Sequence, residues 1–290
     1  MRLIAVAAGA AAISLAAGCA GQETAEPDLS LPIAAIQNSA QLHLPIADYV
    51  PSVNEDEVIG QAVLVLTETC ARRFGAHYTV RSVEQPGLLE GTDRRYGVVD
   101  VDEAARLGYA RPSKKTDGGE QWRPSGREYE VVTGRTSTGG PATVRAADGA
   151  PVPAGGCAED AWRRLRGDGG ELVPLVDGLL NETWTHTLAD SRARAAETSW
   201  IECMREAGHD FHHRWDAAGS VGTAPPEEQR AMAKLDATCA RRVNYVGIWH
   251  AVDSAYQRRA IAQLGDRLTK ALAGQRDLAA RAAEIVRTGY

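Results

Sequence analysis

Four widely spaced cysteines constrain the fold of this chain more than any other feature of its sequence. They are Cys70, Cys157, Cys203 and Cys239, and even the closest two, Cys203 and Cys239, lie far apart. A zinc site built from cysteines usually contains at least one close C-x₂₋₄-C pair, which is missing among these four. Two disulfide bonds, which form in oxidising compartments, are therefore the favoured use of these residues.

A repeated sequence context favours one of the three pairings that four cysteines allow. "CARRFGAHY" from Cys70 and "CMREAGHDF" from Cys203 both place Arg, Gly and an aromatic residue two, five and eight positions after the cysteine. Such a glycine is typical of a helix C-terminus. Cys157 and Cys239 each open a Cys-Ala segment that leads into a helical pattern. The two similar halves predict Cys70–Cys157 and Cys203–Cys239, while crossed pairings remain the alternative.

The start of the chain is typical of an export signal. Arg2 precedes an uncharged run over residues 3–15 that is dominated by Ala, Ile, Leu and Val. A helix of that length rises about 20 Å, whereas the hydrocarbon core of a bilayer is roughly 30 Å thick. The run therefore predicts a signal peptide over residues 1–18, not a membrane-spanning helix. Residues 19–48 are rich in Ala, Gln, Ser, Pro and acidic side chains, and we expect them to form a flexible tether.

The fifth cysteine stands directly after this signal. Ala16-Ala17-Gly18-Cys19 resembles the lipobox of bacterial lipoproteins, although Ala16 occupies a position where Leu is more usual. The resemblance implies a diacylglycerol on Cys19 that anchors the chain to the extracytoplasmic face of the cell membrane. The alternative is an ordinary secretory signal that is removed together with Cys19. Apart from the covalent lipid, we expect no cofactor.

Beyond residue 48 the patterns predict a mainly α-helical protein with a small β insertion. The first half, residues 49–166, begins with a helix over 55–74, for which Asn54 is a plausible cap. Within this half, residues 113–156 are dense in Gly, Pro, Ser and Thr. There, "EYEVVTG" (128–134) alternates like a strand, and a second strand-like stretch carries an Asp148-Gly149 turn signal. We expect a hairpin or small sheet in that insertion.

The second half, residues 171–290, is expected to be helical throughout. One helical pattern runs toward Gly208, and Gly178 is a possible interruption. Beyond Pro226, apolar residues recur every three or four positions, which predicts a long amphipathic helix or a pair of helices broken near Gly274. The pattern is longer than one small core requires. Its C-terminal part is therefore expected either to lie along the domain or to meet an envelope protein partner.

The densest polar cluster of the chain is "HDFHHRWD", residues 209–216. Its imidazoles (His209, His212 and His213) and its two aspartates are potential zinc or copper ligands, but a polar surface loop explains the pattern equally well. The six Trp residues are interpreted mainly as core, with a sugar-binding cleft as the alternative. The sequence contains none of the catalytic motifs that can be recognised from residue patterns alone. We therefore expect a protein that is not an enzyme. A formal net charge of −6 argues against a nucleic-acid partner.

Several longer motifs resemble a family of uncharacterised actinobacterial lipoproteins of the cell envelope. They are "RRYGVVDVDEAARLGYARP" (94–112), "GGCAEDAWRRL" (155–165) and "WIECMREAGHDF" (200–211). These motifs consist of cysteines, glycines and aromatic residues, so the resemblance implies a fold and a location, not an activity. The expected function is that of a lipid-anchored extracytoplasmic protein with a binding or accessory role. The alternative is an anchored or secreted ligand- or metal-binding protein, or a hydrolase, that uses loop 209–216.

Overall fold

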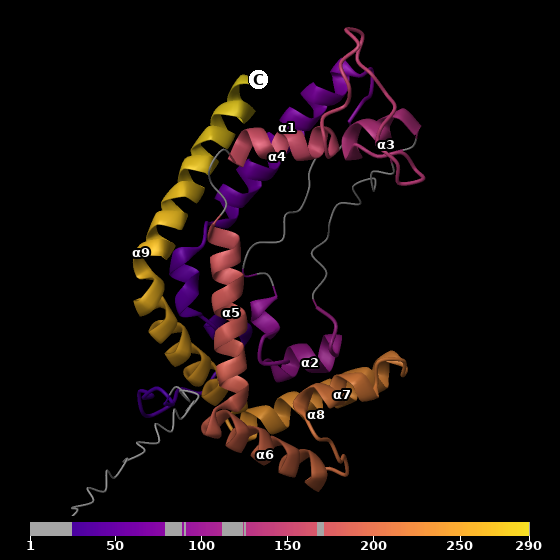
Figure 1. Cartoon of the computed structure of the whole chain (residues 1–290). Helices are drawn as coiled ribbons and strands as arrows, with labels where there is room; N and C mark the ends of the chain where they lie inside the picture. Colours follow the sequence, from indigo (N-terminus) through magenta and orange to yellow (C-terminus); the bar gives the residue numbers. More distant parts are fainter. Residues whose placement is uncertain are drawn as a thin grey trace, which may run out of the picture.

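The computed structural model describes residues 25–78, 89, 91–111, 124, 126–166 and 171–289. This part of the chain is mainly helical, as predicted, and contains nine α-helices and three short 3₁₀ helices (Figure 1). The α-helices are α1 (Val53–Arg73), α2 (Val101–Leu107), α3 (Gly126–Thr133), α4 (Gly156–Arg166), α5 (Leu172–Ala189), α6 (Ser191–Glu206), α7 (Arg214–Ser220), α8 (Pro226–Arg242) and α9 (Tyr245–Thr288). The 3₁₀ helices are η1 (Ser39–Gln41), η2 (Pro45–Tyr49) and η3 (Thr92–Arg94). The expected signal peptide and Cys19 lie outside the described residues.

The two helices that carry the first cysteine of each pair end as the sequence predicts. Gly75 and Gly208 follow α1 and α6 with φ angles of +64° and +89°, the left-handed conformation that glycine adopts without strain. The start of α1 is two residues earlier than expected, because Ser52 and not Asn54 is the cap. The backbone N–H of Glu55 donates to the Ser52 hydroxyl, and the Glu55 carboxylate accepts from the backbone N–H of Ser52 at 2.7 Å.

Gly178 and Gly274, which were expected to interrupt helices in the second half, do not do so, and two helix junctions fall at polar residues instead. Gly178 lies inside α5, and the chain turns at Asp190, whose side chain caps α6. Gly274 lies inside α9, and the break comes at Asn244, which has a φ angle of +50°. Helix α9 is therefore continuous over 44 residues, a length of about 66 Å.

Helix α9 connects two hydrophobic cores, and Figure 1 shows it along one side of the whole molecule. Its N-terminal part packs against α5 and α6 in a core that includes Trp200, Met204 and Leu268. Its C-terminal part packs against α1 and α4 in a second core that includes Leu66 and Leu278. The apolar residues of α9 that suggested a partner helix are thus buried against other helices of the same chain. The envelope protein partner expected on α9 stays a prediction.

The predicted β insertion is not found among the described residues of 113–156. Residues 126–133 form α3, which packs against α4, so the strand expected at 128–134 is wrong. Val131 and Val132 are both buried, and adjacent buried residues fit a helix better than the alternating faces of a strand. The described residues of this region form only isolated bridges: Arg145 with Pro151 around the Asp148-Gly149 turn, and Arg135 with Pro141 around an earlier turn. Residues 112–123 and 125 lie outside the described part.

Residues 25–48, expected to belong to a flexible tether, are instead docked on the helical body. The side chain of Ile46 is fully buried, and its backbone N–H donates to the Gln257 side chain on α9 at 3.3 Å. A second contact lies nearer the start of α9, where Gly247 lets the backbone of the segment approach closely. A Cβ atom on Gly247 would lie 2.3 Å from the carbonyl oxygen of Ala34. Gly247 on α9 thus leaves room for the backbone at Ala34, and the segment is held on the helical body by this contact and by the burial of Ile46.

Replacing Gly247 with Ala tests this docking. Alanine normally favours a helix over glycine by about 1 kcal/mol, but here the added methyl displaces the 25–48 segment or the turn before α9. We expect Gly247→Ala to make this segment the first site of cleavage in limited proteolysis under native conditions. Gly265→Ala is the matched control, because nothing lies within 4 Å of its Cβ position in the same helix. Equal cleavage rates in both variants would contradict the docking.

Candidate functional site

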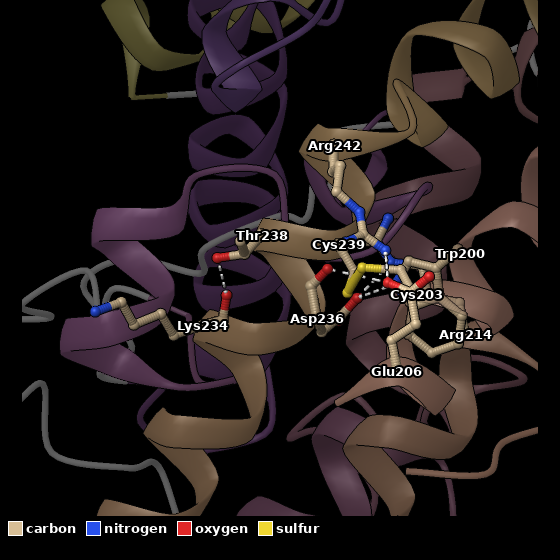
Figure 2. Close-up of a disulfide and its surroundings, with 9 residues drawn as sticks. All are labelled: Trp200, Cys203, Glu206, Arg214, Lys234, Asp236, Thr238, Cys239 and Arg242. Carbon is tan, nitrogen blue, oxygen red and sulfur yellow. Dashed lines mark hydrogen bonds and ion pairs between the residues drawn. A yellow bond between two sulfur atoms is a disulfide. The ribbon is translucent and has the colours of Figure 1, made fainter. Parts of the chain in front are cut away.

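Both disulfide bonds form as predicted, and the second of them lies beside the polar interior of the protein (Figure 2). Cys70 joins Cys157 between α1 and α4, and Cys203 joins Cys239 between α6 and α8, with Cα–Cα distances of 5.6 and 5.7 Å. Each bond closes a long loop, which in a chain-entropy treatment stabilises the folded state by about 4 kcal/mol. Figure 2 shows the Cys203–Cys239 bond beside a buried ion pair.

That ion pair joins Arg214, the first residue of α7, to Asp236 on α8. Both residues are 2% exposed, and the Arg214 Nε donates to the Asp236 Oδ1 at 2.7 Å. The other two guanidinium nitrogens donate to the carbonyl oxygens of Tyr96 and Val98, at 2.5 and 2.6 Å. Trp200 donates its indole N–H to the same Asp236 oxygen at 3.0 Å. Every nitrogen of the guanidinium is therefore engaged by the protein itself, which favours a structural role.

The surroundings of Arg214 are closely fitted to its charge. Its guanidinium lies 4.7 Å from the centre of the Tyr245 ring, and its backbone N–H donates to Glu197 at 2.7 Å. Burial raises the pKa of Asp236, while the Arg214 charge opposes that rise. Gly97 has a φ angle of +87°, and a Cβ atom there would lie 2.9 Å from the Arg214 Cζ. Only glycine allows the chain to wrap this closely around the arginine.

A second buried network fixes the same loop to α9. The Arg95 Nε and the Tyr96 hydroxyl both donate to the Asp253 Oδ2, at 2.6 and 2.7 Å. Arg95 also donates to the carbonyl oxygen of Leu180 on α5 at 2.8 Å, and Gln257 donates to the other Asp253 oxygen at 3.2 Å. Burial and the nearby Asp253 charge both raise the pKa of Tyr96, so this hydroxyl stays protonated. The loop is held rigidly against α5 and α9.

An aromatic cluster lies between these two networks. It consists of Tyr96, Trp184, Trp215, Tyr245, Trp249 and His250. Trp249 on α9 is 2% exposed and stacks with Tyr245 at a centroid distance of 5.1 Å, whereas Trp215 on α7 is 43% exposed. Trp184 on α5 is half-buried and lies between them, 5.4 Å from Trp249 and 5.9 Å from Trp215. The cluster thus extends from the core to the surface and presents an aromatic face on a rigid base.

The Trp residues therefore divide between core and surface. Trp200 and Trp249 are buried, as expected of core residues. Trp162 is half-buried beside the second core, whereas Trp215 is the large exposed exception. Trp122 lies outside the described residues.

The three histidines of loop 209–216 do not converge on a common point. His209 stacks on Phe211, at a centroid distance of 5.8 Å. The backbone N–H groups of His212 and His213 donate to Asp216, which closes the loop ahead of α7. The His213 Nδ1 is 4.0 Å from the Glu197 carboxylate, which already accepts from the Tyr245 hydroxyl. Among the described residues, no three or more His, Cys, Asp or Glu side chains are grouped so that they could hold a metal ion.

The first described residues form a clamp on the corner between α5 and α6. We call Ala25, Glu26 and Pro27 the N-terminal clamp. The Glu26 carboxylate accepts from the backbone N–H and the hydroxyl of Ser191, at 2.6 and 2.8 Å. The carbonyl oxygen of Pro27 accepts from Arg192 at 2.8 Å, and that of Ala25 accepts from Arg259 on α9 at 2.7 Å. The chain is therefore attached to the body from Ala25 onward.

Sequence reasoning missed the polar groups that organise this region. The sequence did not identify Arg214, Arg95, Asp253 or Glu26 as candidate site residues. It also gave no indication that Asp236 is the partner of a buried cation. A sequence signal for Arg95 was its position directly before an aromatic residue and a glycine, Tyr96 and Gly97.

Comparison with protein-family models, with curated proteins and with solved structures found no match for this chain. In the described part of the chain, no helix is both long enough and apolar enough to cross a membrane.

Removing Arg214 tests the structural role of the buried pair. Arg214→Ala leaves the Asp236 carboxylate buried without its cation, so we expect the free energy of unfolding to fall by about 3–5 kcal/mol in urea titrations. The double variant Arg214→Met/Asp236→Leu removes both charges and should regain much of that loss.

The control is the exposed pair Arg242–Glu206, 2.7 Å apart and visible in Figure 2. An exposed pair contributes little, so Arg242→Ala should cost at most about 1 kcal/mol. If the two single substitutions lowered the free energy of unfolding equally, burial would not increase the contribution of the Arg214–Asp236 pair to stability.

Proposed function

We propose that this chain is a lipid-anchored, extracytoplasmic protein of the cell envelope with a non-catalytic binding or accessory role. The observation that carries the proposal is the cysteine pairing. The two disulfides use the other four of the five cysteines, so Cys19 takes part in neither of them. Stable disulfides fit an oxidising compartment outside the cytoplasm, and Cys19 directly follows a sequence typical of an export signal.

The aromatic cluster supports a binding role for the folded part. Trp215 exposes 43% of its surface, yet it packs edge-on against the buried Trp249, with ring centroids 6.1 Å apart. Large exposed aromatic side chains on a rigid base are common at interaction sites, because they bury much apolar area without losing much conformational freedom. We place the binding role at the exposed edge formed by Trp184 and Trp215.

Cys19→Ala tests the anchoring. The variant lacks the thiol that would carry the diacylglycerol, so we expect it to leave the membrane fraction and to appear in the medium or the soluble extract. Cell fractionation followed by immunoblotting measures this, with Cys19→Ser as a second variant that preserves size. Retention of both variants in the membrane fraction would contradict lipid anchoring through Cys19.

Photocrosslinking in intact cells tests the binding role. A photoreactive phenylalanine analogue placed at position 215 should give discrete crosslinked species, which mass spectrometry then identifies. Position 173 is the matched control, because Val173 at the start of α5 is 44% exposed, almost the same as Trp215. The same pattern of products from both positions would contradict a binding edge at Trp184 and Trp215.

The alternative is a ligand- or metal-binding protein, or a hydrolase, that uses loop 209–216. The single approach of His213 to Glu197 is too little for a metal site, since structural zinc takes four ligands. No observation on the described residues favours this alternative over the anchored binding protein.

A further inference from the structure

We infer that the N-terminal clamp sets the orientation of the protein on the membrane, so that the α5–α6 corner faces the lipid surface and the C-terminal end of α9 points away from it. This inference rests on the proposed lipid anchor at Cys19. It adds an interaction surface and a partner, the lipid surface itself, that the anchor alone does not specify.

The clamp is a specific attachment and not a casual contact of a chain end. Glu26 is bound through both carboxylate oxygens, one to the backbone N–H of Ser191 and the other to its hydroxyl. Pro27 is buried, and its carbonyl oxygen accepts from Arg192. The guanidinium of Arg192 is itself held by Asp190, which is 1% exposed, at 2.7 Å. The clamp is thereby tied to the turn between two helices of the main core.

The length of chain before the clamp limits how far the body can lie from the lipid. Only residues 20–24 separate Cys19 from Ala25. Even a fully extended chain over that interval spans about 20 Å. The opposite end of the molecule is much farther from the clamp, because the rise of α9 between Arg259 and Thr288 is about 44 Å. Figure 1 shows the C-terminus at the far end of the molecule from α6.

The side chains near the clamp are compatible with a lipid surface. In the described part of the chain, five large apolar side chains are exposed. One of them, Leu31, follows the clamp by four residues and is 79% exposed, and another, Leu188, precedes Ser191 by three residues and is 43% exposed. Transfer of an exposed leucine side chain from water into an apolar phase is favourable and lowers the free energy of the system. Arg194 and Arg258 are exposed and lie close in the sequence to Arg192 and Arg259, which bind the clamp. Cations near a membrane surface are attracted to anionic phospholipids.

The charges around the clamp are close to balanced, so electrostatics alone would not select this face. The sequence of the clamp and of the segments that it contacts contains Glu26, Asp28 and Asp190 together with Arg192, Arg194, Arg258 and Arg259. The short segment 20–24 is therefore the feature that determines the orientation of the body, and the exposed leucines favour the same orientation. Without the clamp, the attachment would move along the chain toward Ala34, which lies against Gly247, and the body could tilt over a wider range of angles.

Energy transfer to the lipid surface tests the orientation. The purified lipidated full-length protein is reconstituted on phosphatidylcholine vesicles that contain phosphatidylglycerol and an acceptor dye on the lipid headgroup. A donor dye is attached to one added cysteine, at Leu188→Cys near the clamp or at Thr288→Cys at the far end of α9. The native cysteines are engaged in disulfides or carry the lipid. We expect transfer from position 188 to be several-fold more efficient than from position 288.

A variant of the clamp identifies the cause of the difference. Glu26→Ala removes both contacts to Ser191, and we expect the ratio of the two transfer efficiencies to fall toward one while the protein stays bound to the vesicles. Asp28→Ala is the matched control, since it removes an exposed acidic side chain two positions away and should leave the ratio unchanged. Equal transfer from both positions in the otherwise unaltered protein, with binding intact, would overturn the orientation.

The proposed anchor fails in a different way. If the full-length protein made in its host carried no lipid on Cys19 by mass spectrometry, and showed no transfer from either position, the anchor itself would be refuted. A bound, lipidated protein with equal transfer would refute only the orientation. The two failures are therefore distinguishable.

Discussion

The buried pair of Arg214 and Asp236 is the interaction on which the rest of the helical body depends. It lies where α6, α7 and α8 meet, beside the disulfide that joins Cys203 to Cys239. A buried charge is costly unless it is fully hydrogen-bonded, and here the carbonyl oxygens of residues 96 and 98 complete the set of acceptors. The loop before α2 must therefore adopt one conformation, and that conformation brings Arg95 to Asp253 on α9.

The aromatic cluster follows from the same constraint. With the loop fixed, the Tyr96 ring lies 6.2 Å from Trp184 and 6.0 Å from His250. Arg214 is the first residue of α7, so its position also determines where the neighbouring Trp215 is presented. The exposed aromatic edge is thus set by a polar interaction in the interior, and its geometry does not depend on the flexibility of a surface loop.

Local patterns in the sequence were sufficient for the features that depend on local chemistry. The helical class follows from apolar periodicity, and the disulfide pairing follows from glycine-terminated helices in a repeated context. The strand expected at 128–134 was wrong because Glu-Tyr-Glu-Val suggests alternation, while the adjacent Val131 and Val132 are both buried against other helices. The breaks at Asp190 and Asn244 were missed because polar caps are weaker signals in a sequence than glycine.

The parts that could not be predicted are those that join distant segments. Glu26 meets Ser191, and Arg95 meets Asp253, across sequence separations of 165 and 158 residues. Nothing in the local composition of residues 25–48 distinguishes a docked segment from a loose one, because the burial of Ile46 depends on the surface of α9. The candidate site was likewise hidden, since a buried arginine and an exposed one look identical in a single sequence.

The position of α9 has a consequence for the order in which the molecule is completed. This helix supplies one wall to both hydrophobic cores, so neither core is complete before α9 has formed. In the second core, α1 and α4 pack against residues 278–282 of α9, more than a hundred residues further along the chain. Contacts over such sequence separations form slowly, because the long intervening loop must first be closed, so this core is expected to form late in folding.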